Sequence, residues 1–141
     1  LPSRLAMFGR QDVAKHFFVS AHSLVILGSA ATRGAGLAKE LLDARDGSGF
    51  SFADMPANRA GIIYAEHLLA GKISVEKVSQ DFRVTDYMVP IADLAEGLGI
   101  DTLESQFGGK EMSRLVAELA RIEERILELP AYAEKHAATT D

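Results

Sequence analysis

Residues 11–23 read QDVAKHFFVSAHS and residues 38–61 read AKELLDARDGSGFSFADMPANRAG. In both segments polar side chains recur at intervals of three or four among apolar residues, and residues at that spacing share one face of a helix. No segment of the chain alternates between polar and apolar residues over the length of a strand. The pattern therefore predicts an all-α fold, with a polar stripe on each of three successive helices.

The composition is that of one globular domain without cysteine chemistry. The chain has 141 residues, of which 48% are hydrophobic and 25% charged, which is sufficient to bury a core. Its net charge is −5 and its Lys and Arg residues are scattered, whereas nucleic-acid binding needs a concentrated basic face. We therefore exclude a general nucleic-acid binder. The absence of cysteine removes disulfides, thiolate catalysis and cysteine-bound zinc.

Apolar periodicity and turn residues predict five to seven helices in a single compact domain over residues 1–136, followed by a disordered tail at 137–141. The first helix is apolar on most sides, which is typical of a central helix. The last is long and amphipathic, with Met112, Leu115, Val116, Leu119, Ile122, Ile126 and Leu129 on its apolar face. The expected helices cover 13–27, 35–44, 54–70, 75–82, 91–98, one or two turns within 101–107, and 110–129.

Side chains and glycines mark the expected helix ends. Asp12 is a suitable N-cap for the first helix, which Gly28 and the glycine-rich residues 33–36 then end. Either Ser51 or Asp54 caps the third helix, and Ser74 caps the fourth. In the second helix, Leu37, Leu41 and Leu42 are expected to face the core, with Lys39 and Arg45 pointing outward.

The polar stripes supply the candidate binding residues. Buried polar groups must satisfy one another, because an unpaired one costs on the order of 1–3 kcal/mol. If the stripes face inward they should converge, with Gly61 allowing a close helix contact. The expected ligand-binding cluster is His16, Glu40, Asp43, Asp54 and Asn58. Structural roles remain the alternative: Asp12 and Asp54 as N-caps, His16 as a core histidine bonded to a carboxylate, and Glu40 or Asp43 as surface residues.

The same residues limit the possible chemistry. Glu40 and Asp54, tuned by His16, are adequate as a general acid and base for hydrolysis of a glycan or peptide bond. A mixed set of His16, Glu40, Asp43 and Asp54 would suit Mn, Fe or Zn, but no H-E-x-x-H or E-x-x-H pair accompanies it, so we assign no metal and no cofactor. The turn RDGSGFS lacks the lysine and the spacing of a phosphate loop.

The order of these motifs resembles a known family over residues 12–61. Asp12-x-x-Lys15-His16-Phe17, then Glu40-x-x-Asp43, then Ser51-x-x-Asp54-x-x-x-Asn58-x-x-Gly61 is similar to the D-K-x-x-H-F, E-x-x-Q and S-x-x-D-x-x-x-N-x-x-G motifs of VanZ-like proteins. It also resembles the YfiM-like periplasmic lipoproteins. The lysine lies one place before the histidine, and Asp43 replaces the glutamine. The resemblance implies a bacterial protein of the periplasm or cell envelope, although a cytoplasmic location stays open.

Two functions are compatible with this pattern. The first is a non-catalytic envelope protein whose polar pocket binds a small ligand or an envelope component. The second is a hydrolase of cell-wall or lipid-linked material that uses Glu40, Asp54 and His16. A third possibility is that the last helix binds a partner.

The longest uncharged run of the chain, residues 16–32, is at the short limit for a membrane span. We therefore expect it to form a buried helix. Membrane association is possible through an anchor preceding residue 1.

Overall fold

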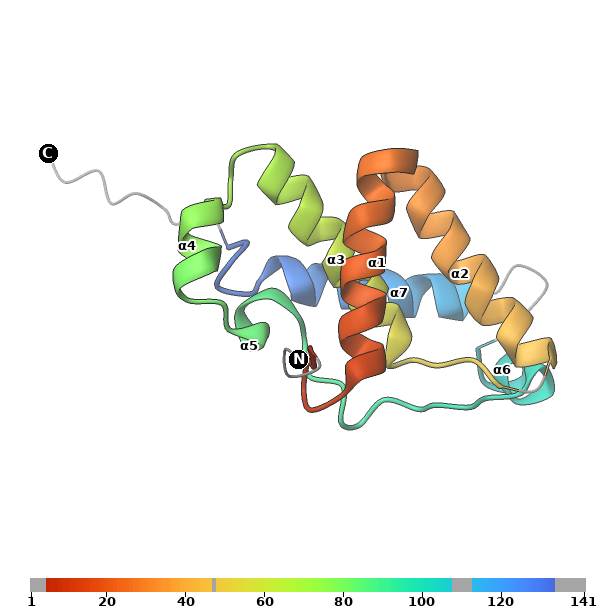
Figure 1. Ribbon diagram of the computed structural model, residues 1–141. Coiled ribbons are helices and arrows are strands. Elements are labelled where there is room, and N and C mark those ends of the chain that lie inside the picture. The colour runs from red at the N-terminus through yellow and green to blue at the C-terminus, as the bar shows by residue number, and fades with distance from the viewer. Residues whose placement is uncertain (1–4, 47, 108–112, 134–141) are drawn as a thin grey trace, which may run out of the picture.

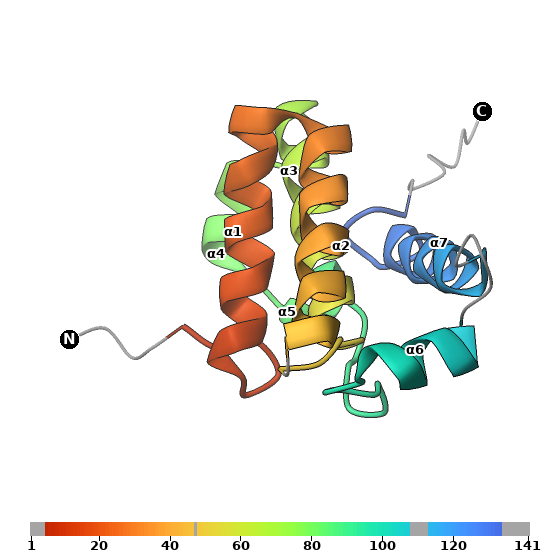
Figure 2. The same cartoon turned by 90° about the vertical axis from the view of Figure 1, so that its right-hand side faces the viewer.

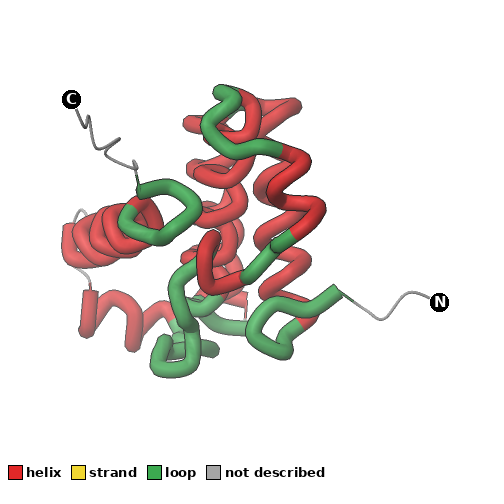
Figure 3. The backbone as a smooth tube through the Cα atoms, turned by 90° about the vertical axis from the view of Figure 1, so that its left-hand side faces the viewer, coloured by secondary structure: helices red, strands yellow, loops and turns green. Residues whose placement is uncertain are grey.

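The computed structural model describes residues 5–46, 48–107 and 113–133, and over these residues the chain forms seven helices and no strand, as predicted (Figures 1 and 3). The expected tail at 137–141, together with Lys110 and Met112, lies outside the described residues. The helices are α1 (Gln11–Leu27), α2 (Ser29–Asp46), α3 (Asp54–Leu69), α4 (Val75–Gln80), α5 (Val84–Tyr87), α6 (Ile100–Phe107) and α7 (Ser113–Leu127).

A single glycine joins α1 and α2 into a hairpin. Gly28 has a φ of 81°, and its amide donates to the Leu24 carbonyl, which ends α1. The chain becomes helical again at once, so the expected helix end at residues 33–36 is wrong and those residues lie inside α2. A glycine within a helix costs about 1 kcal/mol relative to alanine, which tertiary packing readily offsets. Figure 2 shows α1 and α2 side by side, with α3 behind them.

The central helix is α3, and not the first helix as the sequence suggested. An unbroken run of α3 from residue 55 to residue 63 is buried, whereas α1 leaves Val25 and Ile26 exposed. Helix α1 packs more extensively on α3 than any other pair of helices does. A β-carbon built on Gly61 would lie 2.0 Å from the carbonyl oxygen of Phe17. The absence of a side chain at Gly61 therefore permits the close approach of α1 and α3.

Two of the predicted N-caps differ from the structure. Helix α1 begins one residue earlier than Asp12, with Arg10 at the N-cap position, so Asp12 lies in the first turn and is not the cap. The Ser51 hydroxyl accepts a hydrogen bond from the Asp54 amide at 3.2 Å. Ser51 therefore supports the start of α3, and the Asp54 carboxylate is not used as its cap.

The segment between α3 and α6 contains less helix than expected. Ser74 caps α4 by accepting from the Lys77 amide, as predicted. The helix expected at residues 91–98 is absent, and the short helix α5 was not predicted. Backbone hydrogen bonds explain the difference, because Phe50 and Leu98 exchange two of them and the Phe52 amide donates to the Ala95 carbonyl, which uses backbone groups that a helix would need. In Figure 1 the segment runs beneath the lower ends of α1 and α2.

Helix α7 crosses behind α3 and covers it with one face (Figure 1). Leu115, Leu119, Ile122 and Ile126 are buried, which confirms the amphipathic pattern. Val116 is 56% exposed, and so is Leu42 of α2, so both were wrongly placed in the core. Over the described residues, no helix combines the length and the apolar character needed to cross a bilayer.

Candidate functional site

The polar stripes of α1, α2 and α3 meet in one cluster. His16, Glu40 and Asp54 each have one side-chain nitrogen or oxygen atom that lies within 4.8 Å of the corresponding atoms of the other two. Asn58, one turn after Asp54 on α3, adjoins them through His16. The structure thus brings together four of the five residues that the sequence singled out, and each of the three helices supplies at least one.

Hydrogen bonds fix the orientation of the His16 ring. The Oδ1 atom of Asn58 accepts from the Ser20 hydroxyl at 2.9 Å and lies 3.1 Å from His16 Nδ1. An amide oxygen can only accept, so Nδ1 must carry a hydrogen. The other ring nitrogen, Nε2, lies 3.3 Å from Asp54 Oδ2. The Ser20–Asn58 pair therefore directs Nε2 of His16 toward the carboxylates.

Glu40 is the most deeply buried charged residue of the cluster. It is 1% exposed, and its two oxygens have different partners. Oε1 lies 3.3 Å from the Lys39 ammonium, and Oε2 accepts from the Ser51 amide at 3.1 Å. Burial raises the pKa of the Glu40 carboxyl above its usual range, and the Ser51 amide and Lys39 oppose that rise. Glu40 therefore connects α2 to the turn that precedes α3.

Asp54 has an oxygen without a partner. Its Oδ2 faces His16, but Oδ1 is buried and accepts no hydrogen bond from any residue that the structure describes. Burial raises the pKa of this carboxyl, an effect that the nearby His16 opposes. A buried acceptor without a donor is unfavourable by about 1–3 kcal/mol, and more when charged. The cluster thus has more acceptors than donors.

Two of the acidic residues considered from the sequence lie outside this cluster. Asp43 pairs with Lys39 on the same helix, on the partly exposed side of α2. Asp12 pairs with Arg10, whose Nε donates to Asp12 Oδ1 at 3.2 Å. Hydrogen bonding from the Arg10 guanidinium, with a smaller contribution from its charge, holds the pKa of Asp12 below its usual range. Asp43 is thus connected to the cluster only indirectly, through the shared Lys39.

A cavity of about 260 Å³ lies between α1 and α2, directly beside the cluster. His16 and Asn58 belong to its wall, and Gly36 leaves room for the Asn58 amide nitrogen, which would lie 3.4 Å from a β-carbon there. Glu40 and Asp54 are not among the lining residues. The remaining wall consists of Lys15, Val19, Ser20, Ser23, Leu27, Thr32, Ala35 and Lys39.

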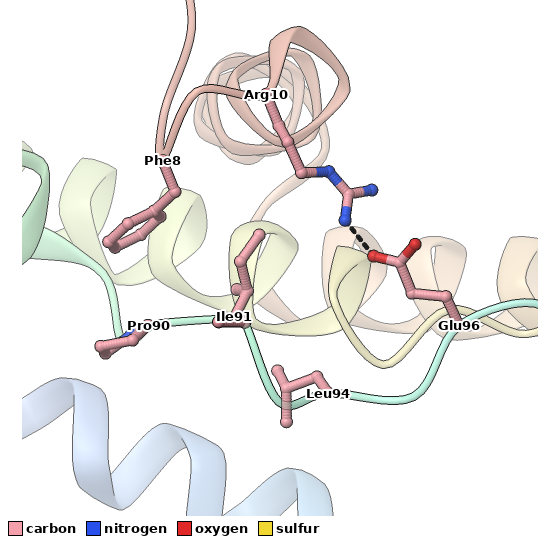
Figure 4. A pocket seen from close by; sticks show the side chains of 7 residues that line it. Phe8, Arg10, Pro90, Ile91, Leu94 and Glu96 are labelled. Carbon is pink, nitrogen blue, oxygen red and sulfur yellow. Dashed lines mark hydrogen bonds and ion pairs between the residues drawn. The ribbon is translucent and has the colours of Figure 1, made fainter.

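A second cavity, of about 450 Å³, lies under the start of α1 (Figure 4). Phe8 points toward the extended segment that carries Ile91 and Leu94, and an ion pair between Arg10 and Glu96 closes one side. This cavity contains no histidine and no residue of the cluster. We therefore assign the candidate site to the cavity between α1 and α2.

The outward placement of Lys39 is confirmed, since its side chain is 54% exposed, but its contacts with two acidic residues were not predicted. The ammonium of Lys39 contacts both Glu40 and Asp43, and the side chain also lines the cavity. The spacing of Lys39 and Asp43, four residues apart on one helix, was the available signal. Sequence reasoning also missed a second, partly buried polar network, which joins α2, α3 and α7 and consists of Arg33, Arg59, Glu66 and Glu123.

The fold and the site define a class of protein: an all-α protein in which a polar cluster of His16, Glu40, Asp54 and Asn58 joins three helices next to a cavity. No protein-family model matches the sequence, and no curated protein or solved structure does so either.

Proposed function

We propose that the cavity between α1 and α2 binds a small ligand and that the polar cluster positions its wall. The observation that carries this proposal is the shared use of His16 and Asn58, which belong to the cluster and also line the cavity. The hydrogen bonds from Ser20 and His16 hold the Asn58 oxygen, so the wall is organised before a ligand arrives. Such preorganisation lowers the entropic cost of binding.

The wall indicates the chemistry of the ligand. Lys15 and Lys39 provide positive charge, and Ser20 and Ser23 provide hydroxyls, while Val19 and Leu27 provide apolar surface. A small molecule with an anionic group and a short apolar part is complementary to this combination. The volume of about 260 Å³ is slightly below the roughly 300 Å³ at which typical ligand pockets begin, which favours a ligand of few atoms.

The hydrolase alternative has one observation in its favour. Burial raises the pKa of both Glu40 and Asp54, as is required of a general acid that must hold its proton near neutral pH. Neither carboxylate lines the cavity, however, and Glu40 is 1% exposed. A general acid or base must come within hydrogen-bond distance of the substrate, so the geometry favours binding over hydrolysis.

An NMR titration with small carboxylates and phosphates tests the proposal. Binding should shift the backbone amides of Ser20, Ser23 and Gly36, and a neutral analogue of the same size should shift them less. Ser23→Leu should fill the cavity and abolish the response, whereas Ser105→Leu, on the exposed surface of α6, should leave it unchanged. If no anionic probe shifts these amides, or if Ser23→Leu binds as the parent does, the proposal is wrong.

We further propose that this function belongs to the bacterial cell envelope, where VanZ-like and YfiM-like proteins operate. The supporting observations are the order of motifs over residues 12–61 and an exposed stripe on α1. Phe18, Val19, His22, Val25 and Ile26 are exposed at intervals that place them on one helix face. An uncharged stripe of this kind would suit a membrane surface.

Cosedimentation with lipid vesicles should fall when Val25 and Ile26 are both replaced by serine. If the variant and the parent cosediment equally, a membrane role for this stripe is contradicted.

A further inference from the structure

The orientation of His16 creates an electrostatic conflict that a cation would remove. With its Nδ1 hydrogen donated to Asn58, a neutral His16 presents the lone pair of Nε2 to Asp54 Oδ2, only 3.3 Å away. Two acceptors at that distance repel each other unless a proton or a metal ion lies between them. Asp54 Oδ1 is buried and has no hydrogen-bond donor within the described part of the chain, so it adds a further unsatisfied acceptor.

We infer that His16, Glu40 and Asp54 form a binding site for a divalent transition-metal ion. The set contains one imidazole nitrogen and two carboxylates, the mixed nitrogen and oxygen ligands that suit Zn²⁺ and Mn²⁺. Each residue comes from a different helix. The ion would thus connect α1, α2 and α3, and the site does not depend on a ligand in the neighbouring cavity.

The spacing of the three donors is close to that of a coordination shell. Ligands about 2.0–2.1 Å from a tetrahedral ion lie roughly 3.3 Å from one another. His16 Nε2 and Asp54 Oδ2 already have this separation, and all three donor atoms lie within 4.8 Å of each other. A change in the Glu40 side-chain conformation would therefore be enough to bring its oxygen to the ion. Each Glu40 oxygen retains a free lone pair in addition to its bond with Lys39 or Ser51.

The surrounding contacts resemble the support that metal ligands usually have. A metal-binding histidine commonly donates its other N–H to an oxygen, which fixes the ring and its tautomer. Here the Asn58 side-chain oxygen accepts the hydrogen bond from His16 Nδ1, and the Ser20 hydroxyl in turn orients Asn58. Ser51 contacts both acidic residues, because its amide donates to the Glu40 carboxylate and its hydroxyl accepts from the backbone amide of Asp54. The sequence contains no H-E-x-x-H or E-x-x-H pair for this site, because the three metal-binding residues lie on separate helices that meet only in the folded chain.

Calorimetric titration of the metal-free full chain with Zn²⁺, and separately with Mn²⁺, tests this inference. We expect one equivalent of Zn²⁺ to bind. Asp54→Asn and His16→Gln should each weaken binding at least tenfold, because each removes one ligand. Asp43→Asn is the matched control: it also removes an acidic charge close to Lys39, but from outside the three donors, and should bind as the parent does.

A measurement on the parent keeps the test independent of variant folding. On addition of Zn²⁺, the ¹⁵N resonance of His16 Nε2 should move, while the ring nitrogens of His22 and His67 should not. The inference is overturned if millimolar Zn²⁺ and Mn²⁺ do not bind. It is also overturned if the response appears at other histidines, or if folded Asp54→Asn and His16→Gln bind with the affinity of the parent.

Discussion

Gly61 sets the distance between the two helices that carry most of the cluster. A β-carbon at this position would lie 2.0 Å from the Phe17 carbonyl oxygen and 3.2 Å from the Ala21 amide nitrogen. His16 and Ser20 are adjacent to these atoms in α1, and both reach Asn58 on α3. The hydrogen bonds that orient His16 therefore depend on the missing side chain of a single residue.

Gly61→Ala should destabilise the protein by about 3 kcal/mol or more, because the added methyl group meets backbone atoms that cannot move independently. Gly34→Ala is the control. Gly34 lies within α2 and a β-carbon there would contact nothing within 4 Å, so this change should stabilise by about 0.5–1 kcal/mol. Urea unfolding followed by circular dichroism measures both. A Gly61→Ala protein as stable as the parent would contradict the close packing of α1 on α3.

Glu40 provides a test of the electrostatics of the metal-free cluster. Burial raises its pKa in the folded state, so between its ordinary value, about 4.3, and the raised value the folded protein binds more protons than the unfolded chain. The Glu40 contribution to stability must then increase as the pH falls through this window. The glutamine side chain of the Glu40→Gln variant does not ionise, so the stability of that variant lacks this dependence on pH.

The free energy of unfolding of the parent, with chelator present, should therefore rise relative to that of Glu40→Gln as the pH is lowered from 7 toward 5. Urea unfolding at a series of pH values measures the difference. A difference that stays constant, or that changes in the opposite direction, would show that burial does not raise the pKa of Glu40. Asp43→Asn is the control in the same series, because it removes a neighbouring carboxylate that also pairs with Lys39 but leaves Glu40 in place.

At the scale of single elements, α7 illustrates what a period in the sequence can predict. Its buried residues, Leu115, Leu119, Ile122 and Ile126, follow the 3.6-residue repeat, and the sequence placed them correctly. Val116 belongs to the same apolar pattern but is exposed. Periodicity defines a stripe on a helix, but the width of the partner surface decides which residues at its edge are covered.

Leu119→Ala should cost about 2–5 kcal/mol, because it removes buried methyl groups and leaves a cavity. Val116→Ala, three residues away on the same helix and exposed, should change the stability by less than about 0.5 kcal/mol. Thermal and urea unfolding of both variants make the comparison. Similar losses in the two variants would mean that α7 packs through a different face.

The segments whose structure was predicted wrongly from the sequence can be explained physically. Gly28 reverses the chain in one residue, and α2 then continues through Gly34 and Gly36, because glycine permits a helix end without requiring one. The segment 91–98 has helical composition, but the backbone hydrogen bonds between Phe50 and Leu98 hold it in a non-helical conformation. Such a pairing joins residues distant in the sequence, and local patterns do not contain it.

For the whole molecule, two polar networks connect the helices, and only one was visible in the sequence. His16, Glu40, Asp54 and Asn58 were identified because their motifs follow one another in order. The second network connects α7 to the hairpin and to α3: Glu123 accepts from Arg33 Nε at 2.9 Å and lies 3.9 Å from Arg59. Burial lowers the pKa of the Arg59 guanidinium, an effect that Glu123 opposes. The charged residues of this network come from three different helices and form no sequence motif, so their association could not be predicted.

Glu123→Ala should destabilise the protein by about 1–2 kcal/mol, because it removes the charged partner of Arg33 and leaves the buried Arg59 less compensated. The loss is limited because Glu123 is partly exposed, and solvent weakens its charge interactions. Glu124→Ala, at the neighbouring exposed position, should have an effect within about 0.5 kcal/mol. Equal effects of the two changes on urea unfolding would show that the network does not fasten α7.

Three helices converge so that Ser20 and Asn58 fix the His16 ring with Nε2 directed at Asp54. Long-range ¹⁵N NMR of the metal-free protein, at an alkaline pH where the imidazole is neutral, tests this arrangement most directly. We expect His16 to carry its hydrogen on Nδ1. A neutral His16 with the hydrogen on Nε2, or an equal mixture of the two tautomers as in a free imidazole, would contradict it.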